Sequence, residues 1–170
     1  MKQYTAIITA AFFCIILLFA TAENAYCQTP VRAAEDPEAL FHSKVPELEK
    51  NKQAAYHIIR DLLEANHWEL AENFLTERYI QHNPNAANGR DAVVKFFTDL
   101  LKVKPSPIPD KIKTPVVSVV AEGDLVIVTS VRTVPDGDTS YTTTWFDMWR
   151  FKDGKADEHW DGATKMKFSK

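Results

Sequence analysis

The order of segments after Pro115 constrains the fold more than any other feature of the sequence. Residues 116–122, 125–134, 140–151 and 155–162 carry the alternating apolar side chains that are typical of β-strands. Each break between them contains a glycine, which can take the positive φ angle of a tight hairpin: Gly123, Gly137 and Gly154. Consecutive strands joined by such turns predict an antiparallel meander.

The chain before Pro115 has the spacing of helices instead. Apolar residues recur on one helical face over residues 47–65, and a shorter amphipathic segment follows over residues 68–75. A third helix is expected to begin near residues 89–91. Between the second and third helices, residues 79–84 are expected to form a loop, because Pro84 and the asparagines around it disfavour a helix. Helices followed by strands predict an α+β fold in which a curved sheet wraps around the helices.

Length and charge limit the domain count and the class of partner. The chain has 170 residues and a formal net charge of −3, so we expect one domain and no nucleic-acid partner. Its two cysteines, Cys14 and Cys27, both lie near the N-terminus. The folded part is therefore expected to contain no disulfide, thiol nucleophile or thiolate metal site.

The N-terminal residues resemble a signal peptide. Lys2 precedes an apolar run over residues 7–20, and Ala20 and Ala22 have the spacing that signal peptidase accepts. We expect a signal peptide over residues 1–22, with cleavage as late as residue 27, and a flexible arm over residues 23–44. The mature protein would then be secreted or periplasmic, with no membrane anchor after cleavage.

Alternation along the last two strands places several chemical groups together. In the strand that ends near residue 151, Trp145, Asp147 and Trp149 share one face. In the final strand, His159 and Asp161 share one face, and the residues between and before them share the other. If these faces line one cavity, two carboxylates and an imidazole converge there, in surroundings that shift pKa values.

Several strings of residues in this order resemble a known family. Tyr79-Ile80-Gln81-His82-Asn83-Pro84, with Gly89-Arg90 opening a helix that contains Phe96-Phe97, looks like the signature of SnoaL-like proteins of the nuclear transport factor 2-like superfamily. The strings Asp147-Met148-Trp149-Arg150-Phe151 and Glu158-His159-Trp160-Asp161 match as well. The resemblance covers residues 50–162, and we expect the domain to span residues 45–165.

The resemblance implies a cone of curved antiparallel sheet closed by three helices, an apolar pocket inside, and a homodimer formed through the outer sheet face. It also implies metal-free acid/base chemistry without a cofactor, as in polyketide cyclases. The related epoxide hydrolases use an Asp–Arg–Asp arrangement, but Arg150 lies on the face opposite Asp147, so this arrangement is not reproduced here.

Each candidate residue has a chemical role and a structural alternative. Asp161 could be the general acid/base, with its protonation set by His159 and Asp147, or it could form a structural pair with His159. His82 could polarise a substrate carbonyl group, or hold its own loop. Substrate contacts are expected from four aromatic residues that could equally be core or interface residues: Tyr79, Phe97, Trp145 and Trp149.

Two functions remain open from the sequence. The first is a lyase or isomerase that acts on a small carbonyl compound without a cofactor. The second is a module that binds a small hydrophobic molecule without changing it. His82, His159 and Asp161 could also be arranged as metal ligands, but no dense ligand motif such as His-Glu-x-x-His is present, so we expect no metal. A dimeric scaffold with an unused pocket is a third alternative.

Overall fold

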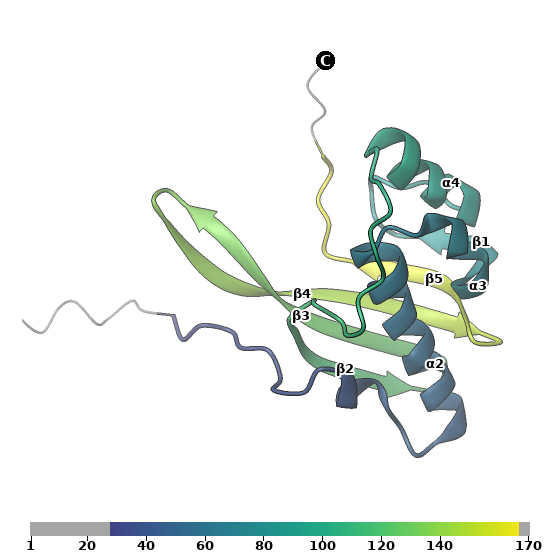
Figure 1. Ribbon diagram of the computed structural model, residues 1–170, viewed down its shortest axis with the longest axis horizontal. Helices are drawn as coiled ribbons and strands as arrows, with labels where there is room; N and C mark the ends of the chain where they lie inside the picture. Colours follow the sequence, from purple (N-terminus) through teal and green to yellow (C-terminus); the bar gives the residue numbers. More distant parts are fainter. Residues whose placement is uncertain (1–27, 167–170) are drawn as a thin grey trace, which may run out of the picture. The chain divides into compact units, whose positions relative to one another are not determined.

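The computed structural model describes residues 28–166, and the chain divides into two units, residues 1–30 and 31–170. The second unit is described here by itself; the expected signal peptide lies outside the described residues. A single curved, open sheet of five strands forms one layer of this unit, in the order β1-β5-β4-β3-β2 (Figure 1). The strands are β1 (Leu75–Gln81), β2 (Val116–Glu122), β3 (Leu125–Asp136), β4 (Thr139–Lys152) and β5 (Lys155–Asp161).

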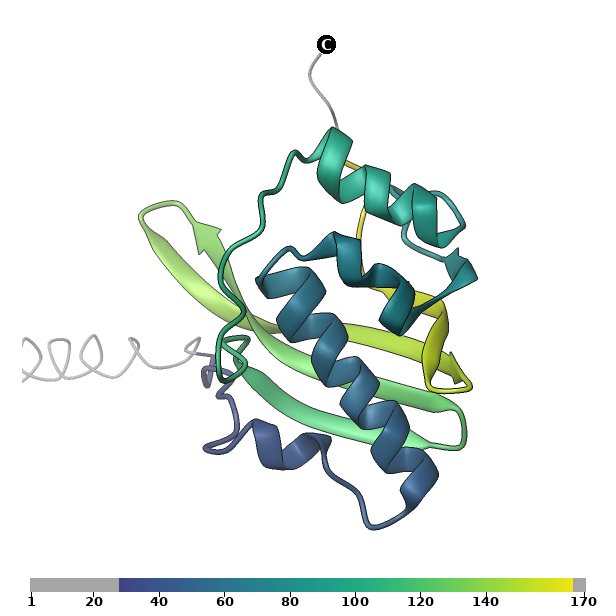
Figure 2. The same cartoon turned by 45° about the vertical axis from the view of Figure 1, so that its right-hand side comes forward.

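Helices cover one face of this sheet (Figure 2). The long helix α2 (Pro46–His57) lies across the strands and continues in wider turns over Ile58–Glu64. It is followed by a 3-10 turn (Trp68–Leu70) and the short helix α3 (Ala71–Phe74). Helix α4 (Arg90–Lys95), extended by further turns over Phe96–Leu100, lies beside β1. The core between helices and sheet is apolar, and its fully buried side chains include Leu62, Leu75, Val126 and Trp149.

The predicted α+β fold is confirmed, and the four predicted hairpin strands are present as an antiparallel meander. Strand β1 was not predicted, because its residues were assigned to the end of a helix and to a loop. It adds to the sheet parallel to β5, so the sheet is mixed. Strand β5 therefore lies inside the sheet, between β1 and β4, although it is last in the chain.

Polar side chains fix β1 against β5. Asp157 on β5 is buried, and its carboxylate accepts hydrogen bonds from the Thr76 hydroxyl at 2.8 Å and from Arg78 Nε at 2.9 Å. Arg78 holds the pKa of Asp157 below its usual value through these charge-assisted bonds. The register that results places Gln81 opposite His159.

The residues just before α2 are packed rather than free. A 3-10 turn (Glu38–Phe41) brings Phe41 into the core, where it is fully buried. Its ring contacts Tyr56 edge-on at 5.4 Å between centroids. A flexible arm over residues 23–44 is therefore not an accurate description of residues 38–41. Among residues 28–166, no helix is both long enough and apolar enough to cross a membrane.

Candidate functional site

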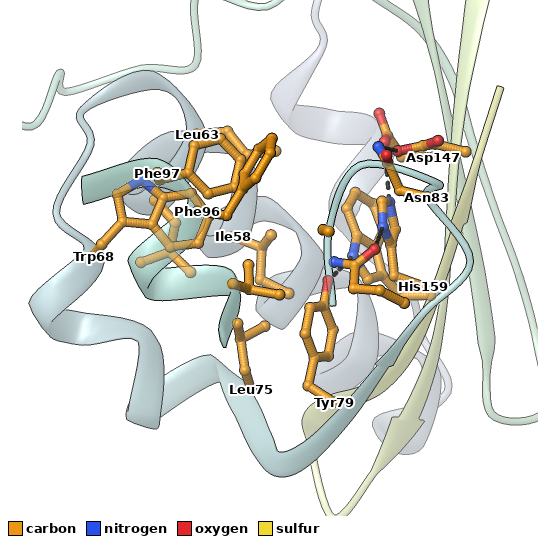
Figure 3. Close-up of a pocket in the computed structure, with 16 residues that line it drawn as sticks. Ile58, Leu63, Trp68, Leu75, Tyr79, Asn83, Phe96, Phe97, Asp147 and His159 are labelled. Carbon is orange, nitrogen blue, oxygen red and sulfur yellow. Dashed lines mark hydrogen bonds and ion pairs between the residues drawn. The ribbon is translucent and has the colours of Figure 1, made fainter. Parts of the chain in front are cut away.

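A cavity of about 100 Å³ lies between the helices and the concave face of the sheet. Its two sides differ in chemistry (Figure 3). One side is apolar and is formed by the helices, with Ile58, Leu63, Trp68, Phe96 and Phe97. The other side is polar and belongs to the sheet and the end of β1, with Tyr79, Gln81, Asn83, Asp147, His159 and Asp161.

The pairing of β4 with β5 brings the titratable groups together. Asp147 is directly opposite Asp161, and Trp149 is opposite His159, all on the face toward the helices. One ligand-type atom from each of Asp147, His159 and Asp161 lies within 4.8 Å of the others. The alternation of the two strands predicted this cluster. Two carboxylates across one strand pair repel each other, and the imidazole beside them offsets that repulsion when it is protonated.

His159 is held by a hydrogen bond at each ring nitrogen. Its Nε2 lies 3.1 Å from Asp147 Oδ1, and its Nδ1 lies 3.0 Å from Gln81 Oε1. Nε2 faces the Asp147 carboxylate and Nδ1 faces the Gln81 amide, so both ring nitrogens have a hydrogen-bond partner and the orientation of the ring is fixed. The second oxygen of Asp147, Oδ2, has no hydrogen-bond partner among residues 28–166. Asp147 therefore has one oxygen bound to His159 and one available to a ligand.

Tyr79 and Trp149 form a buried polar contact at the floor of the cavity. Trp149 Nε1 donates to the Tyr79 hydroxyl at 3.1 Å. Burial raises the pKa of Tyr79 well above its usual value, and the charges of Asp147 and Asp161 raise it further, against the opposing effect of the Trp149 bond. The hydroxyl therefore stays protonated, and its own hydrogen is available to a ligand oxygen.

Asp161 is held at both of its carboxylate oxygens. Asn83 Nδ2 donates to its Oδ2 at 2.7 Å, and the backbone N–H of Ala163 donates to its Oδ1 at 2.8 Å. Asp161 is thus a fixed group beside His159.

His82 does not reach the cavity, which corrects the expected contact with a substrate carbonyl. Its Nε2 lies 2.8 Å from Glu158 Oε1, and its ring stacks on Trp160 at 4.8 Å between centroids. Glu158 and Trp160 project from the face of β5 opposite His159, as the alternation of the strand requires. The backbone N–H of His82 does contribute to the site region, because it donates to the His159 carbonyl at 3.0 Å and so extends the β1–β5 pairing.

The four aromatic residues expected to contact a substrate fall into two groups. Tyr79, Phe97 and Trp149 line the cavity, where Phe97 also stacks on Trp68 at 3.9 Å between centroids. Trp145 lies on the same face of the sheet but lines a neighbouring hollow. The structure therefore separates Trp145 from the cavity residues.

The residues that could hold a metal ion are Asp147, His159 and Asp161, rather than the set with His82 considered from the sequence. One imidazole nitrogen and two carboxylate oxygens are suitable ligands for Zn²⁺ or Mn²⁺. Asp161 already accepts two hydrogen bonds and His159 Nε2 is paired with Asp147, so a metal ion would have to replace the contact between His159 and Asp147.

Sequence reasoning missed Gln81 and Asn83. Both were placed in a loop, and only His82 between them was given a chemical role. Because β1 is a strand through Gln81, alternate residues from Tyr79 face the cavity, and His82 faces away. Counting alternate residues from Tyr79 would have found both.

Comparison with protein families agrees with this geometry. The model of the SnoaL-like domain matches residues 56–159, which is most of the described chain. The chain therefore belongs to the SnoaL-like family of the nuclear transport factor 2-like superfamily. A search of curated proteins finds none that matches significantly.

Solved structures show distant similarity. A nuclear transport factor 2-like protein of unknown function from Burkholderia pseudomallei is 16% identical, with a TM-score of 0.49, over 66% of this chain and 88% of that one. A proposed SnoaL-like polyketide cyclase from Jannaschia is 17% identical, with a TM-score of 0.48, over 71% and 91%. An LEH-like epoxide hydrolase from M. tuberculosis is 10% identical, with a TM-score of 0.47, over 66% and 80%.

Proposed function

We propose that this SnoaL-like domain is a lyase or isomerase that acts on a small carbonyl compound by acid/base chemistry, without a cofactor. The observation that carries the proposal is the Asp147–His159 pair at the polar side of an otherwise apolar cavity. Titratable groups that converge in a cavity of this kind are the usual arrangement for proton transfer.

The roles follow from the hydrogen bonds. Asp147 Oδ2 accepts a proton from the carbon next to the substrate carbonyl, and the electrons of that C–H bond move onto the carbonyl oxygen. The Tyr79 hydroxyl, oriented by Trp149, donates a hydrogen bond to this developing oxyanion. Return of the proton to another carbon gives an isomer, and attack of the enolate on a second carbonyl gives an aldol product.

This assignment changes the role that the sequence suggested for Asp161. Both Asp161 oxygens already accept hydrogen bonds, whereas Asp147 Oδ2 has no hydrogen-bond partner among residues 28–166, so Asp147 is better placed to take a proton from the substrate. We propose instead that Asp161 is a positioning residue beside His159, and that His159 orients Asp147 through the hydrogen bond to its Oδ1. His82 has no part in the chemistry in this proposal.

The cavity also limits the group that reacts in it. An engineered apolar cavity of about 150 Å³ holds benzene, so a cavity of about 100 Å³ holds a group of roughly four non-hydrogen atoms. Asp147 and Asp161 are acidic, and no lysine or arginine of the described part of the chain lines this cavity. The reacting end of the substrate is therefore a small uncharged ketone or aldehyde.

Deuterium exchange tests the proposal without knowledge of the natural substrate. Butanone is incubated with the protein in D₂O, and incorporation at the carbons beside the carbonyl is followed by ¹H NMR. We expect Asp147→Asn to slow the protein-dependent exchange by about 10²- to 10⁴-fold, the usual contribution of a general base. Asp138→Asn, in the exposed β3–β4 turn, is the matched control.

Two further measurements sharpen the result. Asp161→Asn is expected to reduce exchange less than Asp147→Asn, because it acts through His159. A chelator is expected to leave exchange unchanged. Exchange at the wild-type rate in Asp147→Asn would refute the proposal, and loss of exchange on chelation with recovery on adding Zn²⁺ would replace it with a metal-dependent mechanism.

The second function is binding of a small hydrophobic molecule without reaction. The observation that favours it is the extent of the apolar wall, in which Trp68 and Phe97 form a stacked pair. A ligand recovered with unchanged mass, together with no deuterium exchange in any ketone, would support this function over catalysis.

Export remains a proposal that depends on residues outside the described part of the chain. We propose that residues 1–22 are removed and that the mature protein is secreted or periplasmic. Intact-mass measurement of the protein recovered from the periplasm or the medium tests this. A mass that retains the N-terminal methionine and residues 2–27 would contradict it.

A further inference from the structure

A second, larger hollow adjoins the cavity. Its volume is about 510 Å³, and its lining includes Arg132 and Trp145 on the strands, with Asn85, Leu101, Gly162 and Met166. Two residues, Asn83 and Phe96, line both spaces. The cavity and the hollow are therefore neighbours that share part of their lining.

The two spaces have opposite charge. Among residues 28–166, the cavity is lined by Asp147 and Asp161 and by no lysine or arginine. Of the described residues that line the hollow, Arg132 is the one that is charged. A molecule that lies across both would place an uncharged end in the cavity and an anionic end in the hollow.

Arg132 is held in place but not neutralised. Its guanidinium group lies over the Trp145 ring, 4.8 Å from the centroid. Within residues 28–166 it forms no ion pair or hydrogen bond. Four other arginines lie beside acidic side chains: Arg60, Arg78, Arg90 and Arg150. Arg32, like Arg132, forms no ion pair among the described residues. An arginine stacked on an aromatic ring keeps its donors free for a carboxylate, which it can bind with two parallel hydrogen bonds.

We infer that the hollow beside Arg132 and Trp145 is a binding site for the carboxylate end of an elongated oxo acid whose carbonyl end lies in the cavity. This placement of the carbonyl end rests on the function proposed above. Trp145 thereby has a ligand-binding role, in the hollow rather than in the cavity where it was first expected. Phe96 and Asn83 form the wall that the ligand chain crosses.

The test uses two probes of nearly equal size, 5-oxohexanoate and its methyl ester. The chain has four tryptophans, and their indole N–H signals in a ¹⁵N-labelled sample report on different places. Trp149 reports on the cavity, Trp145 on the hollow, and Trp160 on the opposite face of the sheet. We expect the acid to shift Trp149 and Trp145 with one common saturation curve and to leave Trp160 unchanged.

Variants then separate charge recognition from binding in general. Because Arg132 is exposed, Arg132→Gln is expected to weaken binding of the acid by about three- to tenfold and to leave the ester unaffected. The control is Arg150→Gln, which removes an arginine that lies over Trp160 on the other face. It should change neither affinity.

The outcomes are distinct from those for the proposed reaction. Equal binding of acid and ester, or an Arg132→Gln protein that binds both as before, would overturn the inference. A shift of Trp145 without Trp149 would overturn the bridging of the two spaces. Asp147→Asn with deuterium exchange at the wild-type rate would refute the proposed reaction but not the anion site in the hollow, because the tryptophan shifts measure binding alone.

Discussion

Replacing Tyr79 with phenylalanine removes a single hydroxyl group from the floor of the cavity and leaves the ring in place. That hydroxyl accepts the hydrogen bond from Trp149 Nε1 at 3.1 Å, and the two residues are 3% and 1% exposed. The indole N–H has no other acceptor among the described residues, so the variant leaves a buried donor unpaired. The expected cost is about 1–3 kcal/mol of unfolding free energy.

Thermal and urea unfolding, followed by tryptophan fluorescence, measure this cost. For a domain of this size the loss corresponds to a decrease in Tm of about 3–9 °C. Tyr141→Phe is the control, because Tyr141 is 47% exposed and its hydroxyl can be hydrated. The double variant Tyr79→Phe/Trp149→Phe should show a coupling of about 1 kcal/mol between the two sites.

The same variant also tests the catalytic argument. At a temperature where it is folded, Tyr79→Phe should slow deuterium exchange into butanone by about 10²-fold, as expected when one donor to an oxyanion is removed. If neither the unfolding midpoint nor the exchange rate changes, then the hydroxyl neither holds Trp149 nor faces the ligand, and both arguments fail.

Three other predictions concern the scaffold. The lowered pKa of Asp157 means that its bond to Arg78 contributes stability above the usual aspartate pKa of about 3.9, and this contribution is lost as the pH falls below it. Asp157→Asn should therefore lower stability at pH 7 and flatten its decline in acid, as measured by urea unfolding from pH 7 to 2; an unchanged pH profile would contradict this. The expected homodimer remains a prediction. Val120 and Phe146 are 57% and 52% exposed on the outer sheet face, so Phe146→Lys should give a monomer by light scattering, and a wild-type monomer would refute it. Gly89→Ala should lower the free energy of unfolding, measured in urea, by about 1–3 kcal/mol, because the backbone φ angle at Gly89 is 100°. The nearest atom leaves room for a methyl group, so the cost comes from the backbone angle. An unchanged urea midpoint would show that the backbone relaxes.

The sequence predicted the parts of the site that depend on local pattern. Alternation placed His159 and Asp161 on one face of the final strand, and predicted that Asp147 joins them if the faces of the two strands line one cavity. Each hairpin was predicted from a glycine in its turn, and these glycines have positive φ in the structure, as at Gly123 and Gly154. The turn alone does not fix the register at the site. Lys152 pairs with Lys155 beside the turn, but a bulge between Arg150 and Phe151 shifts the pairing by one residue, and only this shift brings Asp147 opposite Asp161.

Strand β1 could not be predicted in the same way. Its partner is about half the chain away, since Leu75 pairs with Ala156, and no turn sets the register. Its residues before Pro84 also lie between two helices, so their pattern is short and ambiguous. The assignment of His82 to the cavity and the omission of Gln81 and Asn83 are both results of this one missed strand.

The place of β5 in the sheet has a consequence for the order of folding. This strand is last along the chain but lies between β1 and β4, so β1 has no place in the sheet until β5 is present. Pairs so distant in sequence form slowly, because the long loop between them must close first. We therefore expect hydrogen exchange during refolding to protect the β2–β3–β4 meander before β1. The cavity would become complete only in the final step, when Gln81 meets His159.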